Sequence, residues 1–404
     1  MTEKAFPCAV VLDIAFAGYG VLRSLAAYGI PLIGFYNSKT LPESYTRLCK
    51  RKIFFKNNDE LLQQLIKLPE SLDKMPVLIL TTDTYVEFYV KNRQVLEGKY
   101  LMNMPDNVTV DLLMNKNKFK DFAKENGVLI PRSFEIRNDN DLKKLSGILR
   151  FPVIMKPYMR TEAWLASGFK KAYIVPDFER LSELYETVSV AENYFILQEY
   201  IQGNDDHIEY CLTYFSRWSE CKVAFTGQKI RQWPVSTGST ATTIPVKNDW
   251  ICNETERIFR ILNYSGFGSI EYKRDAQDGK YYLIEPTVGR LNQQEYVATL
   301  AGYNIPLEAY RDLTGIDIKP REAERNSIVY IDELAEVQSV WVHFRRKLLT
   351  FSQLRKSLQG KRYYRYFNGN DLSVFFLGMP AKVYHKLLHT VKTFFGRANH
   401  VQQN

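Results

Sequence analysis

The sequence predicts an α/β (α+β) fold, and three features of the chain support this. Residues 5–105 alternate apolar runs with amphipathic runs, which is the βαβ pattern of a parallel sheet. Later segments are rich in β-formers, and two of them flank an Asp-Gly turn that predicts an antiparallel hairpin. The 404 residues, 45% of them hydrophobic, suffice for two or three domains with sizeable cores.

The first hundred residues show the clearest alternation. Buried strands read as continuous apolar runs, and helices place apolar residues three or four apart. The expected strands are 9–14, 31–36 and 77–82, and the expected helices are 20–28, 61–68 and 86–96. Gly18 and Gly20 follow the first strand, but the full dinucleotide fingerprint is absent, so we expect neither NAD nor FAD here.

The following two hundred residues mix helices with longer β-rich runs. Asp111 is expected to cap a helix that Gly127 ends. The further expected strands are 151–156, 195–201, 207–214 and 221–228, and the further expected helices are 181–188 and 249–263.

Two glutamates in the predicted hairpin carry the strongest chemical signal. A three-residue loop, 277–279, would put Gly279 in the left-handed bulge position and Glu271 directly opposite Glu285. Their Cβ atoms would then lie about 5 Å apart, so the carboxylates would repel each other unless a cation joined them. Hard cations such as Mg²⁺ take carboxylate oxygens and substrate phosphates. The alternative is two solvated glutamates on an exposed sheet face.

Further chemistry-bearing residues occur in a fixed order around this hairpin. Lysines suit phosphates, a strand end offers backbone groups that read an adenine edge, and arginine binds a carboxylate with two bonds. In chain order the candidates are Lys116, Lys156, the stretch Glu199, Tyr200 and Ile201, then His207, Glu209, Glu271, Glu285 and Arg290. Each alone is more simply a surface or structural residue, and the ordered set carries the argument.

This order resembles the ATP-grasp superfamily of carboxylate–amine ligases over residues 5–320, and most of all the D-aspartate ligase type. The segments 228–231 (Gln-Lys-Ile-Arg) and 285–290 (Glu-Pro-Thr-Val-Gly-Arg) are similar to that type. The resemblance implies ATP and Mg²⁺ as cofactors. It also implies an N-terminal parallel-sheet domain at 1–108 and an ATP-grasp domain at 109–325. That domain would comprise two ATP-clamping subdomains, at about 125–195 and 196–325, ahead of a basic aromatic C-terminal region at 326–404.

The resemblance also implies roles for single residues. Lys116 and Lys156 would contact the nucleotide phosphates, and Glu199, Tyr200 and Ile201 would line the adenine, with His207 or Glu209 nearby. The metal ligands would be Glu271, Glu285 and Thr287, and the catalytic cations Lys229, Arg231 and Arg290. One departure concerns Thr287, which stands where the family pattern has Asn and offers a metal only a neutral hydroxyl.

The implied function is an ATP-dependent ligase that forms an amide through an acyl phosphate. A cell-envelope or polysaccharide precursor would supply a substrate, and no nucleic-acid partner is expected. The alternative is a non-catalytic ATP-binding or scaffold protein on the same fold, which Thr287 favours. Five scattered cysteines form no metal or disulfide pattern, so a cytoplasmic location is expected.

The net charge of +9 is concentrated at the C-terminal end. Residues 341–404 hold 12 Lys and Arg and one acidic residue, a sum of +11, so the preceding 340 residues sum to −2. This region reads as a folded subdomain, as a nucleic-acid surface, or as a peripheral contact with anionic membrane through an amphipathic helix at 381–395. We expect the subdomain together with the membrane contact.

Overall fold

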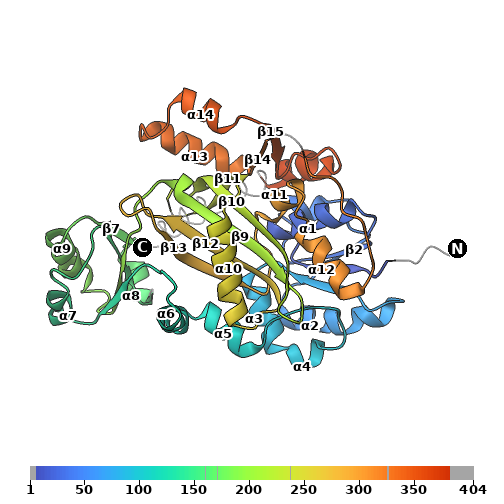
Figure 1. Cartoon of the computed structure of the whole chain (residues 1–404), viewed down its shortest axis with the longest axis horizontal. Helices are drawn as coiled ribbons and strands as arrows, with labels where there is room; N and C mark the ends of the chain where they lie inside the picture. The colour runs from blue at the N-terminus through green and yellow to red at the C-terminus, as the bar shows by residue number, and fades with distance from the viewer. Residues whose placement is uncertain (1–5, 160, 171, 237, 325–326, 383–404) are drawn as a thin grey trace, which may run out of the picture. The chain divides into compact units, whose positions relative to one another are not determined.

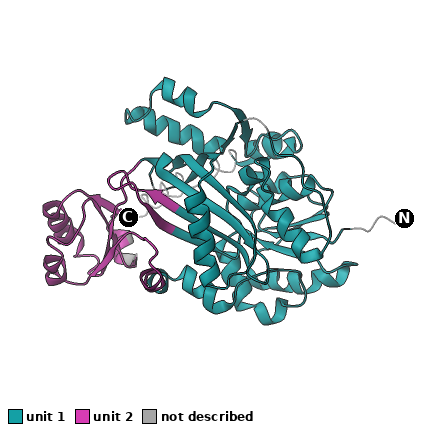
Figure 2. Ribbon diagram, in the orientation of Figure 1, with its two compact units in different colours: residues 1–119, 204–271, 285–404 teal, residues 120–203, 272–284 magenta. Residues whose placement is uncertain are grey.

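The computed structural model of the chain describes residues 6–159, 161–170, 172–236, 238–324 and 327–382 (Figure 1). The chain forms two compact units, and each contains segments that are far apart in the sequence (Figure 2). Unit 1 comprises residues 1–119, 204–271 and 285–404, and unit 2 comprises residues 120–203 and 272–284. The three-part division expected from the sequence stays a prediction.

Unit 1 begins with a parallel four-stranded sheet in the order β3-β2-β1-β4. Its strands are short and their side chains are almost entirely apolar, as in sheets covered by helices on both faces. The elements are β1 (Ala9–Leu12), α1 (Ala17–Ala26), β2 (Leu32–Tyr36), η1 (Pro42–Tyr45), β3 (Arg51–Phe54), α2 (Asn58–Lys67), η2 (Leu68–Ser71), β4 (Val77–Leu80), α3 (Asp83–Lys91), α4 (Arg93–Leu96) and α5 (Asn107–Met114).

The second sheet of unit 1 has seven strands in the order β13-β12-β9-β10-β11-β14-β15. Its strands are β9 (Ile208–Phe215), β10 (Cys221–Trp233), β11 (Ser239–Pro245), β12 (Gly266–Arg274), β13 (Tyr281–Val288), β14 (Ile328–Ile331) and β15 (Lys361–Tyr364). The associated helices are η3 (Asp205–His207), α10 (Asp249–Ile261), α11 (Glu295–Leu300), α12 (Ile305–Thr314), α13 (Glu333–Arg345), α14 (Phe351–Ser357) and the π-helical turn η4 (Val374–Gly378).

One hydrophobic core joins the two sheets of unit 1. Tyr19 of α1, Leu212 of β9 and Tyr310 of α12 are each at most 1% exposed and belong to the same cluster. The C-terminal region takes part as well, because Tyr366 and Val374 lie in this cluster. The described residues 327–382 are therefore folded as part of unit 1, and the expectation of a C-terminal subdomain stays a prediction.

Unit 2 is built on a smaller antiparallel sheet in the order β5-β8-β6-β7. A separate core of aromatic and aliphatic side chains, which includes the buried Trp164 and Phe195, lies on one face of it. Its elements are β5 (Ser133–Ile136), α7 (Asp139–Lys144), β6 (Val153–Pro157), α8 (Glu162–Ala166), β7 (Tyr173–Val175), α9 (Phe178–Val188) and β8 (Phe195–Glu199). Helix α6 (Lys116–Glu125) precedes them.

The α/β (α+β) class is confirmed, and the differences from the predicted elements have local causes. The helix expected to start at Asp111 starts earlier, because Asp106 caps α5 by accepting from the Thr109 N–H, and Asp111 lies inside that helix. A second helix, α6, begins after Asn115. The final helix expected at 381–395 lies almost wholly outside the described residues. Within the described part of the chain, no helix has the length and apolar character needed to cross a bilayer.

The predicted hairpin is present, but its loop is one residue longer than expected. The Asp275 N–H donates to the Lys280 carbonyl at 2.8 Å, so the loop runs from Ala276 to Gly279 rather than from Gln277. The Ala276 N–H donates to Gln202, which removes it from the expected pair with Lys280. Gly279 has φ +70°, so its predicted left-handed conformation is confirmed.

A buried carboxyl group in unit 1 makes stability depend on pH. Glu295 of α11 is fully buried, and its Oε1 accepts from Ser24 Oγ at 2.6 Å and from Thr299 Oγ1 at 2.8 Å. Burial raises the pKa of Glu295 from 4.5 to about 7, against the lowering effect of these two hydroxyls. The folded state therefore holds this proton more tightly than the unfolded chain does.

We expect Glu295→Gln to remove that pH dependence. In the native protein the contribution of Glu295 to the free energy of unfolding falls by about 3 kcal/mol as the pH rises from below 4.5 through 7. Glutamine keeps an oxygen for the two hydroxyls and does not ionise. Urea unfolding at pH 5.5 and pH 8 gives the free energy of unfolding of both proteins. The value of the variant relative to that of the native protein should be higher at pH 8 than at pH 5.5. The exposed Glu87→Gln is the control, and parallel pH curves for native and Glu295→Gln proteins would contradict the assignment.

Candidate active site

The paired glutamates lie on neighbouring strands at the edge of the seven-stranded sheet. In unit 1 the Gly289 N–H donates to the Phe267 carbonyl at 2.8 Å, and counting along both strands from that pair puts Glu271 opposite Glu285. The hydrogen bond from Asp275 to Lys280 at the tip of the hairpin implies a register that differs by one residue from the register at Gly289 and Phe267. One extra residue must therefore lie between the two points, as in a β-bulge.

The pKa of Glu285 shows that several predicted residues surround it. The Glu285 side chain is exposed on one side, but neighbouring atoms remove part of the solvent around its carboxyl group; this effect is the largest and raises the pKa, and the charges of Glu271 and Asp83 raise it further. The charges of Arg290 and Lys116 lower it. Unit 1 thus places two further carboxylates and two cations near Glu285, which is the setting in which a bound divalent cation relieves repulsion.

Lys229 is a buried cation beside the first glutamate. Its side chain is 5% exposed, and its Nζ lies 2.6 Å from Glu271 Oε2 and 3.3 Å from Gln232 Oε1. Gln232 is itself held by Asp205, which accepts from its backbone N–H at 2.8 Å and from its side-chain amide at 3.0 Å. Lys229 is therefore oriented by a hydrogen-bonded network of buried side chains.

Arg290 is held in a fixed orientation next to the glutamates. Its Nε and one terminal nitrogen form a two-pronged ion pair with Asp83, at 2.5 and 3.0 Å. The other terminal nitrogen donates to Asn292 Oδ1 at 2.7 Å, and Asn292 in turn donates to Ser269 Oγ at 2.7 Å. The planar guanidinium is thus fixed on both of its edges.

Asp83 and Asn292 were missed by sequence reasoning. Asp83 follows β4 directly, and the carboxyl ends of parallel strands are where α/β proteins place ligand-binding groups, so its position was the available signal. Asn292 has the amide side chain that is absent at position 287. It lies seven residues after Glu285, which is outside the short motif, so the motif did not identify it.

Arg231 does not join this group of residues. It is 3% exposed, and its Nε lies 2.8 and 3.0 Å from the two carboxylate oxygens of Glu336 on α13. Ser357 of α14 accepts from its NH1 at 2.7 Å. The register of β10 shifts on both sides of Arg231, and Arg231 and Lys229 have different partners. These contacts favour a role in holding α13 and α14, and the catalytic role predicted for Arg231 stays a prediction.

The remaining candidates of unit 1 have varied environments. Thr287 is 7% exposed on β13, and Lys116 starts α6 and is exposed. His207 ends η3, and Glu209 of β9 accepts from Asn248 Nδ2 at 2.7 Å. Their predicted roles toward metal or nucleotide stay predictions.

In unit 2, Lys156 lies on the half-exposed face of the sheet. Its Nζ is 3.3 Å from Gln198 Oε1 on the neighbouring strand. Side chains of β6 and β8 alternate between buried and half-buried, which puts Lys156 and Gln198 on the face opposite the core. A lysine held on an open sheet face is placed to meet an anionic ligand.

The stretch predicted to line adenine ends strand β8. Glu199 points to the buried face, where Arg132 donates to its Oε1 at 2.8 and 2.5 Å. The backbone N–H groups of Glu199 and Tyr200 donate to Arg132 and Pro152. The ring of Tyr200 lies 4.6 Å from Lys273 Nζ, and Ile201 is 4% exposed. Any contribution of Glu199 to a ligand on the open face would therefore come from its backbone.

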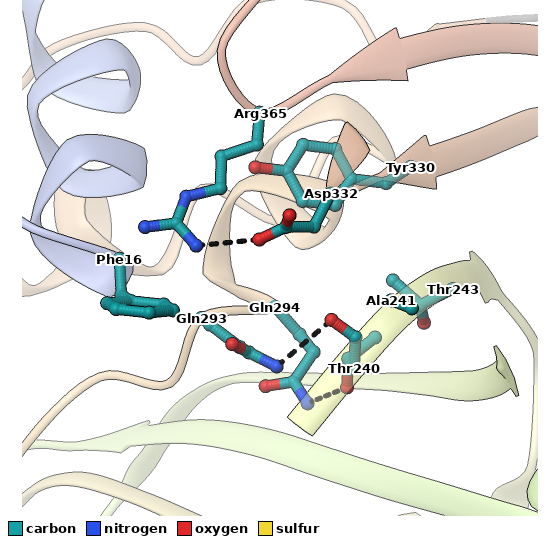
Figure 3. A pocket seen from close by; sticks show the side chains of 9 residues that line it. All are labelled: Phe16, Thr240, Ala241, Thr243, Gln293, Gln294, Tyr330, Asp332 and Arg365. Atoms are coloured by element: carbon teal, nitrogen blue, oxygen red, sulfur yellow. Dashed lines mark hydrogen bonds and ion pairs between the residues drawn. The ribbon is translucent and has the colours of Figure 1, made fainter. Parts of the chain in front are cut away.

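A narrow pocket in unit 1 is lined by both hydrogen-bond donors and acceptors (Figure 3). Gln294 donates to Thr240 Oγ1 at 2.7 Å, and Asp332 accepts from Arg365 at 2.7 Å. Gln294 is 4% exposed and its Oε1 has no hydrogen-bond partner within the described part of the chain. The full lining is Phe16, Thr240, Ala241, Thr243, Gln293, Gln294, Tyr330, Asp332 and Arg365. About 10 Å³ is open to the centre of a water molecule, which is room for one water.

The residues present fit a hard cation. Glu271 and Glu285 supply the oxygen ligands that Mg²⁺ prefers, usually one or two carboxylates with substrate phosphates completing the shell. Among the described residues no cluster of three or more His, Cys, Asp or Glu side chains could hold a metal by itself. Such a pair is therefore suited to a cation that arrives with a phosphate ligand.

The comparisons with known proteins point in one direction. No protein-family model matches the sequence. The chain is 24% identical to a D-aspartate ligase of Enterococcus faecium over 305 residues, which are 71% of this chain and 72% of that protein.

Solved structures share the fold. An N5-carboxyaminoimidazole synthetase from Staphylococcus aureus complexed with ADP matches with a TM-score of 0.58 and 14% identity, over 86% of this chain and 88% of that one. The biotin carboxylase domain of a Hydrogenobacter thermophilus 2-oxoglutarate carboxylase, in complex with MgADP, matches with a TM-score of 0.54 and 16% identity, over 78% and 71% of the two chains.

Proposed function

We propose that this chain makes an amide through an acyl phosphate. The premise is that it is an ATP-grasp enzyme of the carboxylate–amine ligase group that uses ATP and Mg²⁺. The observation that carries the proposal is the arrangement around Glu285, where Glu271, Asp83, Lys116 and Arg290 are all near enough to shift its pKa. This arrangement combines a metal-binding pair with cations that can bind a transferring phosphoryl group.

The chemistry follows from charge. A carboxylate oxygen of the substrate attacks the γ-phosphorus of ATP, the bond from that phosphorus to the bridging oxygen breaks, and ADP leaves with the oxygen. The nitrogen of a neutral amine then attacks the acyl carbon, phosphate leaves, and the nitrogen loses a proton. Mg²⁺, when bound by Glu271 and Glu285, would offset charge on the phosphates.

This chain's own cations have separate roles in the proposal. Arg290, oriented by Asp83 and Asn292, offers its positive charge and the remaining N–H groups of its terminal nitrogens to the carboxylate or its acyl phosphate. Lys229 neutralises Glu271 at 2.6 Å and supplies charge next to the transferring group. Lys116 and Lys156 are assigned to the nucleotide phosphates.

The substrate class is the finer part of the proposal. The named activity of the Enterococcus relative suggests an acidic amino acid as the carboxylate substrate, with D-aspartate as the first candidate. The amine would then belong to a cell-envelope or polysaccharide precursor.

Hydroxylamine trapping tests the function without knowledge of the amine. The protein is incubated with ATP, Mg²⁺, hydroxylamine and one amino acid at a time, and hydroxamate and ADP are measured. Equal amounts of hydroxamate and ADP with an acidic amino acid would support an acyl phosphate. ATP binding without ADP release for any carboxylate tested would instead favour a non-catalytic ATP-binding protein.

Arg290→Lys is expected to lower kcat about 100-fold while KM for ATP stays nearly unchanged. Lysine keeps the charge but cannot make the contacts with both Asp83 and Asn292, so the cation is no longer oriented toward the charge that develops in the transition state. Steady-state ADP release measures both constants. Arg311→Lys, an arginine in a similar ion pair on α12, serves as the control. Native ligation rates in Arg290→Lys would contradict the assigned role.

A further inference from the structure

The two helices α13 and α14 form a hairpin, residues 333–357, with two contrasting faces (Figure 1). One face of α13 packs on the seven-stranded sheet, where Glu336 is 7% exposed and Ser339 is fully buried. Glu336 accepts from Arg231 of β10 and from Thr242 of β11, so the hairpin is anchored by buried charge-assisted bonds. The outward surface of the hairpin is therefore carried by a fixed element.

The outward face of the hairpin is apolar. Val337, Trp341 and Phe344 follow one another at four and three residues, which is one stripe along α13, and Leu348 lies in the turn that follows the helix. They are 70%, 60%, 39% and 60% exposed, and Phe351 at the start of α14 is 74% exposed. Neighbouring large apolar side chains with this exposure mark an interaction surface rather than ordinary scatter.

The turn between the two helices fixes Leu348 in this exposed position. Lys347 ends α13 in the left-handed conformation, at φ +57°. The Leu348 N–H then reaches back to the His343 carbonyl at 2.9 Å, which is the bond that closes a Schellman motif. The apolar stripe thus continues from α13 into the turn.

Every charged side chain on the exposed surface of residues 337–357 is cationic. From 337 to 357 the sequence has five basic residues, all of them exposed, and no aspartate or glutamate. They are Arg345, Arg346, Lys347, Arg355 and Lys356. The Arg345 guanidinium lies 5.4 Å from the centre of the Trp341 ring, so charge and apolar surface are interleaved.

We propose that the α13–α14 hairpin docks on an anionic membrane surface, with Trp341, Leu348 and Phe351 entering the headgroup region. Charge complementarity selects this partner, because a wholly basic surface is attracted to anionic lipid. The side-chain types agree, since interfacial helices pair Trp, Phe and Leu with Lys and Arg, and Trp prefers the headgroup level. None of the exposed side chains of the hairpin belongs to the proposed catalytic site, so this inference is independent of that site.

Vesicle co-sedimentation of the full chain tests the proposal. The vesicles are phosphatidylcholine alone or phosphatidylcholine with 30% phosphatidylglycerol, at low and high salt. The native protein should bind the anionic vesicles, and about tenfold more weakly in high salt or without phosphatidylglycerol. The variants Trp341→Ala/Phe351→Ala and Arg345→Glu/Arg346→Glu should each reduce binding about tenfold or more.

Matched control variants distinguish binding through the hairpin from non-specific binding to vesicles. Trp218 is 76% exposed with the Arg217 guanidinium 4.6 Å from its ring, so Trp218→Ala removes an equivalent pair elsewhere. Arg51→Glu/Lys52→Glu makes the same charge change on β3, and Lys386→Glu/Lys392→Glu makes it in the C-terminal tail. Circular dichroism confirms that each variant is folded.

Each outcome decides the proposal. Loss of binding in both hairpin variants, with native binding in the three controls, supports it. No preference of the native protein for anionic vesicles overturns it. It is also overturned if the hairpin variants bind like the native chain while the tail variant does not. Native self-association that Trp341→Ala/Phe351→Ala abolishes, without vesicle binding, would assign the surface to a second copy of the chain instead.

Discussion

Replacing Glu285 with glutamine is expected to lower kcat about a thousandfold or more. The substitution removes one negative charge and almost no volume, and it leaves Glu271 with Lys229 2.6 Å away. A site with one carboxylate and a competing lysine would hold Mg²⁺ poorly. ADP release measured over a range of Mg²⁺ concentrations should show low activity that excess metal restores only in part.

The same site predicts a dependence on pH. The pKa of Glu285 is raised first by partial desolvation of its carboxyl group and then by the charges of Glu271 and Asp83, so protons compete with the metal at a higher pH than for an ordinary glutamate. The Mg²⁺ concentration for half-maximal activity should therefore rise as the pH falls. The exposed Glu97→Gln is the control. Native kcat in Glu285→Gln, with an unchanged melting temperature, would refute the metal assignment.

Replacing Lys156 with alanine is expected to weaken ATP binding about ten- to hundredfold. The change removes a charge-assisted contact to a phosphate, worth about 1.5–3 kcal/mol. Lys156 lies on the half-exposed face of unit 2 with Gln198 as its neighbour, so its loss should not disturb the buried core. Titration calorimetry with ATP gives the affinity directly.

Lys143→Ala is the matched control for Lys156. It also removes a lysine from unit 2, from an exposed ion pair with Asp139 on α7. Surface pairs of this kind add little to stability or binding. An equal loss of ATP affinity in both variants would show a general effect of charge rather than a contact at Lys156.

The sequence predicted best those elements whose local pattern agrees with their tertiary setting. Strands β1, β2 and β4 are continuous apolar runs, and the parallel sheet follows from them. Strand β3 was not predicted, because its Arg51-Lys52 start is exposed at the sheet edge and reads as a loop. Strand β15 was missed for the same reason, since Lys361 and Arg362 are both exposed.

The candidate site could be predicted in its residue types but only partly in its arrangement. Glu271, Glu285 and Arg290 follow from a hairpin and a short motif, and both are local in sequence. Arg231 and Lys229 were both expected to be catalytic cations, but the register of β10 is irregular at Arg231, and the two side chains have different partners. The burial of Arg231 against Glu336, 105 residues away, is a long-range contact that no spacing reveals. Asp83 likewise reaches Arg290 across 207 residues.

The divided make-up of unit 2 affects how the chain folds as it is made. Its second segment, 272–284, contributes bonds that its first segment cannot replace, such as the Leu283 N–H to the Leu129 carbonyl at 2.8 Å. The buried Asp275 pairs with Arg150 at 2.8 Å. Until the ribosome has released the hairpin, Leu129 and Arg150 lack these partners.

The rate of translation sets how long the first segment of unit 2 exists without its second segment. Between residue 203, where the first segment ends, and residue 272, where the second begins, a whole stretch of the other unit is synthesised. At about 5–20 residues per second this takes roughly 3–14 s. During that interval the first segment is an incomplete domain with its hairpin missing, and it is then that a nascent chain of this protein should be most open to chaperones and proteases.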